Sequence, residues 1–198
     1  MANDLEKLLK NPDRLEHWLR LHPPLARPQP SIPQGWGSYP EELTDASVLL
    51  LLQPSRSGTQ LWFVQRSPDL RKHAGQIAFP GGKPEPHDAS LWHTALRESQ
   101  EEIGLEPEGV RQLGQLDQCW TPSGFRIHPF LGWNAGQPPQ ALPNSEIERA
   151  FCVPLAELVQ AQEAQPPWPR YATSHGVVWG ATGRILHGCL QILQEAST

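Results

Sequence analysis

Apolar and polar residues alternate along the chain with two different spacings, and these spacings predict its helices and strands. Two short helices are expected at the N-terminus, the second with Asn11 as its cap. The apolar run at 47–52 predicts a strand buried on both faces, and 60–66 predicts its partner across a Ser-Gly turn. Further strands are expected at 77–79, 110–120 and 125–133, and further helices at 89–103, 155–161 and 182–193.

A stretch rich in proline separates the N-terminal helices from the first long strand. Between residues 22 and 40 it holds six of the chain's 22 prolines, and too little chain precedes it to fold alone. We therefore expect residues 1–44 to form the N-terminal helices and an extended strap, and residues 45–198 to form one domain. The strap could also form a contact between two copies of the chain.

The composition excludes several classes of partner. The 16 Lys and Arg against 21 Asp and Glu give a formal net charge of −5, which argues against a nucleic acid or an anionic membrane as partner. The longest apolar run falls far short of the roughly 20 residues that a membrane span needs. The N-terminus lacks the apolar core of a signal peptide, and the three cysteines show no CxxC pair. We therefore expect a cytoplasmic protein with reduced cysteines.

Three glutamates share one face of the helix expected at 89–103. Glu98, Glu101 and Glu102 stand at i, i+3 and i+4, where like charges repel and destabilise an isolated helix. They also lie near the helix C-terminus, where the macrodipole disfavours anions. A divalent cation reverses the sign of both effects, because Mg²⁺ and Mn²⁺ bind clustered carboxylates. Arg97, four residues before Glu101, is placed to orient that carboxylate.

The alternative for this cluster is a solvated acidic face without a ligand. Two neighbouring features favour a binding site instead. Apolar residues on the opposite side of the same helix, such as Leu96 and Ile103, let the acidic face point into a cleft. The rigid turn at 79–82, Phe-Pro-Gly-Gly, can bring backbone N–H groups close to an anionic ligand.

The Gly81-Gly82 pair and the run at 97–105 together resemble the Nudix box, G-x5-E-x7-R-E-U-x-E-E-x-G-U, where U is bulky and apolar. Two positions depart from this pattern. Ser99 stands where the box has an apolar residue, and the interval from Gly82 to Arg97 is one residue longer, with Asp88 near the place of the first box glutamate.

This resemblance implies an α/β fold (α+β in some schemes), namely an α/β/α sandwich around a mixed, curved sheet with the box helix on one side. It also implies Mg²⁺ or Mn²⁺ as cofactor. The implied metal ligands are Glu98, Glu101 and Glu102, with Arg97 as the orienting residue.

The segment before the box resembles the signature of coenzyme A pyrophosphatases, L-L-T-x-R-S-x3-R-x3-G-x3-F-P-G-G. The match runs from Arg66 to Gly82 at every spacing, whereas Trp62, Phe63 and Val64 replace Leu-Leu-Thr. Further resemblance lies at 121–125, 144–147 and 178–182. The substrate-binding residues that this resemblance implies are Arg66, Arg71, Gly75, Phe79, Gly81 and Gly82.

The implied reaction is hydrolysis of the pyrophosphate bond of coenzyme A or acyl-CoA, giving 3′,5′-ADP and (acyl-)4′-phosphopantetheine. Metal held by carboxylates can neutralise the phosphates and activate the attacking water. Glu98 and Glu101 are the implied catalytic carboxylates, assisted by Arg97. Arg66, Arg71 and Lys72 form a basic island that suits a small phosphorylated substrate.

Two further assignments stay open in the sequence. Glu146 is either an additional ligand or base, or a charge at the N-terminus of the next helix. Adenine could stack on Trp36, Trp120, Trp168 or Trp179, although core packing is favoured for Trp179.

Two other functions compete with coenzyme A hydrolysis. The first is a Nudix pyrophosphohydrolase for another nucleotide, such as ADP-ribose, a dinucleotide or a nucleoside triphosphate. The second is a Nudix module that binds nucleotides without hydrolysis. The intact carboxylate cluster argues against the second, because a site without catalytic function would not need to retain carboxylates that repel one another.

Overall fold

The structure, a computed structural model, describes residues 2–26, 42–140, 145–164 and 168–195. Most of the expected proline-rich strap, with Trp36, and Asn144 of the 144–147 motif lie outside these residues. The helices are α1 (Ala2–Leu9), α2 (Pro12–Leu21), α3 (Leu91–Ile103), η1 (Pro107–Gly109), α4 (Leu155–Gln160) and α5 (Gly180–Glu195). The strands are β1 (Thr44–Ser55), β2 (Gly58–Arg66), β3 (Ile77–Ala78), β4 (Gly81–Gly82), β5 (Val110–Gln115), β6 (Cys119–Trp120), β7 (Phe125–Asn134), β8 (Ile147–Pro154), β9 (Gln162–Ala164), β10 (Arg170–Thr173) and β11 (Gly176–Val178).

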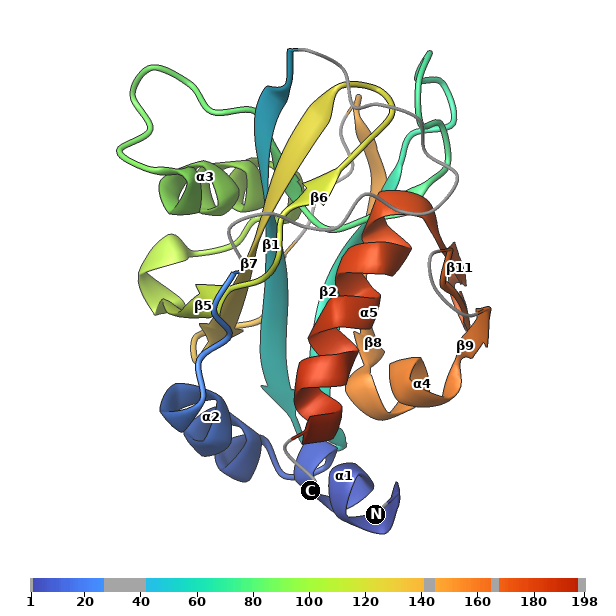
Figure 1. The fold of residues 1–198 in the computed structure, drawn as a ribbon. Helices are drawn as coiled ribbons and strands as arrows, with labels where there is room; N and C mark the ends of the chain where they lie inside the picture. Colours follow the sequence, from blue (N-terminus) through green and yellow to red (C-terminus); the bar gives the residue numbers. More distant parts are fainter. Residues whose placement is uncertain (1, 27–41, 141–144, 165–167, 196–198) are drawn as a thin grey trace.

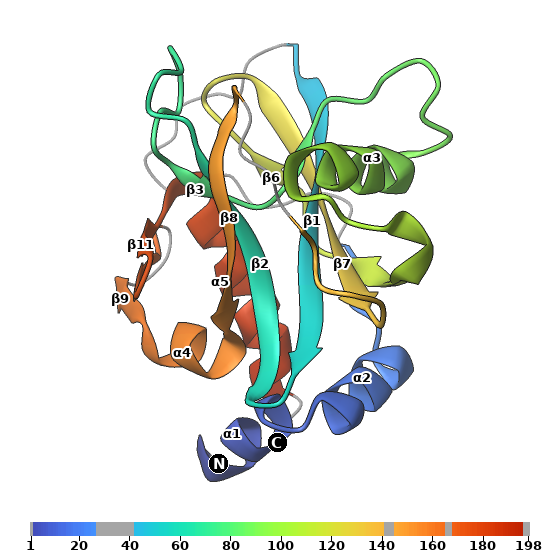
Figure 2. The same ribbon diagram turned by 180° about the vertical axis from the view of Figure 1, so that it is seen from behind.

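A mixed sheet forms the centre of the molecule, with α3 on one face and α5 on the other (Figures 1 and 2). Its strands follow the order β3-β2-β1-β7-β5, while β4 pairs with β1, β6 with β7 and β8 with β2. The β1–β7 pair is parallel and the other pairs are antiparallel. This arrangement confirms the α/β/α layers expected from the sequence.

Strand β1 is buried on both faces, as its apolar run predicted. Leu49 and Leu51 pack in the cluster that includes Leu96 and Ile103 of α3. The intervening Leu50 and Leu52 belong to the cluster on the opposite face, which includes the buried residues of α5. Because successive side chains of a strand point to opposite faces, a single leucine run supplies both cores.

The N-terminal helices are packed onto this body. Asn11 caps α2 by accepting a hydrogen bond from the Arg14 N–H at 3.1 Å, as the sequence predicted. Leu15 and Leu19 are fully buried in the cluster on the α5 face. Gly58 lies so close to the backbone of Leu9 that a Cβ would crowd the Leu9 carbonyl oxygen, 2.9 Å away. These helices therefore share the core of the main body.

Several element boundaries differ from the sequence prediction. The strand expected at 110–120 is divided into β5 and β6, which both pair with β7, and between them the Leu116 N–H also donates to the Pro129 carbonyl of β7. Helix α3 begins at Leu91, since Ser90 accepts from the His93 N–H as its cap. Strand β8, which pairs with β2, was not expected from the sequence.

The prediction that Trp179 packs in the core is wrong. Its exposed fraction is 50%, because it lies between β11 and α5, just before Gly180 turns the chain with a φ of 65°. The three cysteines, by contrast, are free thiols, and Cys119 and Cys189 are buried. Burial raises the pKa of Cys119 to about 11, which suits an inert core residue. Within the described part of the chain, no helix combines the length and the apolar character needed to cross a membrane.

A charged network joins the beginnings of the parallel strands β1 and β7. The Asp45 carboxylate accepts from Arg126 Nε at 2.6 Å and Nη2 at 2.8 Å, and His128 Nε2 lies 2.7 Å from Asp45 Oδ1. Hydrogen bonds from Arg126 lower the pKa of Asp45 from its ordinary value of 3.8 to about 2. The ionised carboxylate therefore stabilises the folded state above about pH 4, and this contribution fades as the pH falls towards 2.

We predict that Asp45→Asn destabilises the protein by about 1–2 kcal/mol at pH 7, because a partly exposed charged hydrogen-bond pair is lost. The difference in free energy of unfolding between variant and wild type should be smaller at pH 3, where part of the stabilisation by the ionised wild-type carboxylate is lost. Urea unfolding at the two pH values measures this difference. Asp69→Asn, at an exposed loop position, is the control and should change little. An equal gap at both pH values would contradict the proposed electrostatic cause.

Candidate active site

Helix α3 is fixed at both ends and along one face. Ser90 caps its start, and Gly104 ends it in the left-handed conformation with a φ of 66°. Leu96 and Ile103 are buried against the sheet, and the Trp92 ring meets Phe130 edge-on with centroids 5.7 Å apart. The apolar face expected from the sequence therefore packs against the sheet, and the glutamates face the turn that precedes the helix.

The Gly81-Gly82 turn is the surface that these glutamates meet. Strand β4 pairs Gly82 with Ser47 and Gly81 with Val48, so the turn is a fixed extension of the sheet. A Cβ at Gly81 would overlap the Ser47 carbonyl oxygen, and a Cβ at Gly82 would overlap the Glu98 carboxylate. The two glycines are therefore required by close approach on both sides of the turn.

Glu102 carries the most buried carboxylate of the cluster. The residue is 8% exposed, and its Oε2 accepts a hydrogen bond from the Gly81 N–H at 2.9 Å. Burial raises its pKa to about 7, with the nearby charges of Glu98 and Glu146 adding to the rise, and the Gly81 N–H and Arg66 opposing it. The pKa of half-buried Glu98 is also raised by burial, against the opposing charge of Arg97. These carboxylates are poorly compensated negative charges, which suits a site for a cation.

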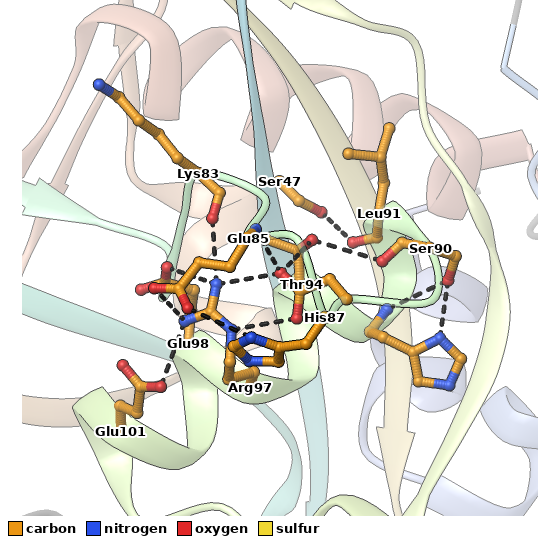
Figure 3. A network of polar contacts seen from close by, with 12 residues as sticks. Ser47, Lys83, Glu85, His87, Ser90, Leu91, Thr94, Arg97, Glu98 and Glu101 are labelled. Atoms are coloured by element: carbon orange, nitrogen blue, oxygen red, sulfur yellow. Dashed lines mark hydrogen bonds and ion pairs between the residues drawn. The ribbon is translucent and has the colours of Figure 1, made fainter.

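Arg97 is the centre of the polar network in Figure 3. Its Nε and Nη2 donate to the two oxygens of Asp88 at 3.1 Å each, and its Nη2 also donates to the Lys83 carbonyl oxygen at 3.0 Å. It pairs with Glu98 at 3.0 Å as well. The hydrogen bonds from Arg97 hold the pKa of Asp88 well below its usual range. Asp88 thus supplies the carboxylate that anchors Arg97, close to where the box pattern has its first glutamate.

Glu101 lies on the solvent side of this network. Its side chain is 59% exposed, and its Oε1 accepts from Arg97 Nη1 at 3.2 Å (Figure 3). Within the described residues, no group of three Asp, Glu, His or Cys side chains is gathered closely enough to hold a metal ion as the side chains stand. At least one of the three box glutamates therefore has to move before all three can contact one ion.

Arg66 and Glu146 meet beside the buried carboxylates. Arg66 Nη2 lies 3.6 Å from Glu146 Oε2, and the Ser67 N–H donates to the Glu146 carbonyl at 2.8 Å. The Nε of Arg66 is buried without a hydrogen-bond partner among the described residues. Glu146 precedes strand β8, so its alternative role as the charge at a helix N-terminus is wrong. The structure therefore brings Arg66 and Glu146 together with Glu98 and Glu102.

The remaining residues of the coenzyme A signature occupy different environments. Arg71 is exposed on the loop at 67–76, which is closed at its base by the bond from Gly75 N–H to the Arg66 carbonyl at 3.2 Å. Gly75 has a φ of 68°, so its place is explained by the turn. Phe79 is 4% exposed and stacks on Phe63 with centroids 5.0 Å apart. Phe79 therefore shapes the core below the site and presents no face to a substrate.

Sequence reasoning missed two buried hydroxyl groups of the site. Thr94 donates to Asp88 at 3.0 Å, and Ser47 donates to the Leu91 carbonyl oxygen at 2.6 Å. Both are fully buried. A serine inside the apolar run of β1 was the available signal for Ser47, and a threonine six residues after Asp88 gave none by itself.

Comparison with known proteins identifies the family of the chain. The NUDIX domain family matches residues 43–174, which include β1, the Gly-Gly turn and α3. The chain therefore belongs to the Nudix family.

Two relatives are named "Uncharacterized Nudix hydrolase NudL". The one from Pectobacterium atrosepticum is 39% identical over 137 residues, 64% of this chain and 71% of the relative. The one from Salmonella newport is 38% identical over 136 residues, with the same coverage of both chains. The protein is thus a Nudix hydrolase, a class that generally depends on divalent metal ions.

Solved structures of low sequence identity share the fold. The Nudix hydrolase RenU of M. smegmatis superposes with a TM-score of 0.58 at 16% identity, covering 77% of this chain and 86% of its own. The NUDIX domain of Shewanella oneidensis NrtR, solved with ADP ribose, gives a TM-score of 0.54 at 19% identity, covering 85% of this chain and 94% of its own.

We predict that Glu102→Gln stabilises the metal-free protein. At pH 8 with a chelator, the change removes a buried charge beside Glu98, while the amide oxygen can still accept from the Gly81 N–H. The free energy of unfolding should rise by about 1–3 kcal/mol, measured by urea unfolding. Glu101→Gln, at an exposed side chain, should change it by less than about 0.5 kcal/mol. A less stable Glu102→Gln variant would show that this charge is well compensated in the fold.

Proposed function

We propose that this protein hydrolyses the pyrophosphate bond of coenzyme A or acyl-CoA, giving 3′,5′-ADP and (acyl-)4′-phosphopantetheine. The observation that carries the proposal is the position of Arg66. This cation lies at the base of the signature loop and directly beside Glu146 and the buried carboxylates of α3. A guanidinium group that can bind phosphate therefore lies beside carboxylates that can bind a metal ion. Cleavage of a phosphoanhydride requires both.

The donor set of the site fits Mg²⁺ or Mn²⁺, because hard divalent cations favour carboxylate oxygens. Glu98 and Glu102 offer half-buried and buried carboxylates at the Gly-Gly turn, and Glu101 would join them by turning away from Arg97. A bound ion would neutralise phosphate charge and lower the pKa of a coordinated water. Arg97 would keep its ion pairs with Asp88 and Glu98 whether the Glu101 carboxylate faces Arg97 or the metal. The other contacts of Arg97 therefore need not change when Glu101 turns.

Glu146 is the proposed base or additional ligand. It is held at the edge of the site through its own backbone, which accepts from the Ser67 N–H, and its carboxylate faces Arg66. Its side chain is 64% exposed, so it can exchange a proton with solvent. Arg66, paired with it at 3.6 Å, can turn its guanidinium to a substrate phosphate without leaving the site.

The signature loop supplies the proposed selectivity for coenzyme A. Arg71 and Lys72 are exposed on it, a short distance along the chain from Arg66. Coenzyme A differs from ADP-ribose and from simple dinucleotides in its 3′-phosphate, which adds negative charge away from the scissile bond. Exposed cations beyond Arg66 are suited to that second anionic group.

A substrate panel tests the reaction. The purified protein, with Mg²⁺ or Mn²⁺, is incubated with CoA, acetyl-CoA, ADP-ribose, NADH and nucleoside triphosphates, and the products are identified by chromatography. We expect 3′,5′-ADP and 4′-phosphopantetheine from CoA as the fastest turnover. Glu101→Gln should lower kcat by at least about a hundredfold while circular dichroism stays unchanged. Glu106→Gln, an exposed glutamate just after the box, is the matched control and should keep full activity.

Two outcomes of the panel would contradict the proposal. Cleavage of ADP-ribose or of triphosphates without cleavage of CoA would assign the site to another nucleotide. Binding without turnover of any substrate would make the chain a nucleotide-binding Nudix module. Full activity of Glu101→Gln would move the catalytic carboxylate elsewhere.

A further prediction separates the 3′-phosphate from the rest of the substrate. Arg71→Ala should raise KM for CoA about tenfold but leave KM for dephospho-CoA, which lacks that phosphate, nearly unchanged. Steady-state kinetics on both substrates measures the difference. Arg56→Ala, which removes an exposed arginine from the β1–β2 turn, controls for net charge. Equal effects of Arg71→Ala on both substrates would show that Arg71 does not read the 3′-phosphate.

A further inference from the structure

Ser47 is a polar side chain buried at the junction of the sheet, the Gly-Gly turn and α3. It is fully buried within the apolar run of β1. Its hydroxyl donates to the carbonyl oxygen of Leu91, the first residue of α3, at 2.6 Å (Figure 3). Its backbone pairs with Gly82, and its carbonyl oxygen closes off the space beside Gly81.

The contact at Leu91 lies on the same side of the helix as the half-buried Glu98 and the buried Glu102. Leu91, Glu98 and Glu102 are separated by seven and eleven residues, which are close to two and three full helical turns. The Ser47 hydroxyl donates to the Leu91 carbonyl oxygen, and the Gly81 N–H donates to the Glu102 carboxylate. Between them, Gly82 lies against the Glu98 carboxylate. Two hydrogen bonds and one close approach therefore fix the helix to β1 and to the turn along about 16 Å of one helix face.

We infer that Ser47 is a positioning residue for the metal site and sets where α3 lies along the Gly-Gly turn. This inference rests on the proposed function, because it requires metal at the box glutamates. The apolar contacts of α3 are non-directional and tolerate small sliding of the helix. The short hydrogen bond from Ser47 fixes the distance between the helix and β1, the strand that carries the turn. Its loss changes the spacing of Glu98 and Glu102 without removing a ligand.

Ser99 provides a matched comparison for a purely structural role. It is also fully buried, and its hydroxyl also donates to a carbonyl oxygen of α3, that of Ala95, at 2.6 Å. Both groups of this bond belong to α3, so the bond does not connect the helix to the sheet. Truncation of Ser47 and of Ser99 removes the same chemical group with the same burial, but only the former breaks a hydrogen bond between the helix and β1.

The test compares Ser47→Ala, Ser47→Cys and Ser99→Ala with wild type in Mn²⁺ binding, measured by calorimetry at a temperature where circular dichroism shows each protein folded. Ser47→Cys leaves no cavity, because sulfur is larger than oxygen, but its thiol donates only weakly, so it separates loss of the hydrogen bond from creation of a cavity. We expect both Ser47 variants to bind Mn²⁺ about tenfold more weakly than wild type. With CoA as substrate, their kcat should fall while KM changes little. Ser99→Ala should keep wild-type affinity within about twofold even where its melting temperature falls.

Wild-type Mn²⁺ affinity in Ser47→Cys would overturn the inference. Equal losses of affinity in the Ser47 and Ser99 variants would overturn it too, because general loosening of the helix would then suffice. A wild-type protein that binds no Mn²⁺ would overturn both the proposed metal site and this inference, and so is distinguishable from a failure of Ser47 alone.

Discussion

The close approach of α3 to the Gly81-Gly82 turn is the constraint on which the rest of the site depends. The turn can lie there because β4 pairs with β1, and the helix can approach because neither glycine has a side chain to separate them. That approach buries the carboxylate of Glu102 against a backbone N–H and presses Glu98 against Gly82. The contacts of Arg97 with Asp88 and Glu98 limit the repulsion that this approach creates.

The fold accepts an unfavourable charge distribution to build this site. Glu98 and Glu102 raise each other's energy in a partly desolvated place near a helix C-terminus. Arg97 offsets part of that cost, and it is itself fixed by Asp88, whose other hydrogen bonds come from the Glu85 N–H and the Thr94 hydroxyl. The compensation is incomplete, since the pKa of Glu102 remains raised. A divalent cation would complete the compensation of these charges. Binding of such a cation would explain the acidic face of α3, which a merely solvated surface would not.

The sequence was informative where local chemistry decides the structure. The Asn11 cap, the Gly104 helix end and the double burial of β1 follow from short patterns, and the structure confirms them. It failed where distant contacts decide. Trp179 is exposed because of the turn at Gly180, and Phe79 is buried because it stacks on Phe63 of another strand. The contact of Arg97 with Glu101 was predicted from their spacing, whereas the additional contacts of Arg97 with Asp88 and with the Lys83 carbonyl come from a preceding loop that helical spacing does not describe.

In the proposed function, metal binding and substrate selection are divided between different elements of this fold. The carboxylates come from α3, which is held against the sheet along its length, whereas Arg71 and Lys72 are carried on the exposed loop at 67–76. Arg66 connects the two, because it ends β2, anchors the loop through Gly75 and Gln76, and pairs with Glu146 beside the carboxylates. A rigid helix suits a reaction common to a whole family, and a loop with few buried contacts can change its sequence without disturbing that helix. Membership of the Nudix family therefore accounts for the carboxylate cluster, and in the proposed function the loop that begins at Arg66 selects the substrate.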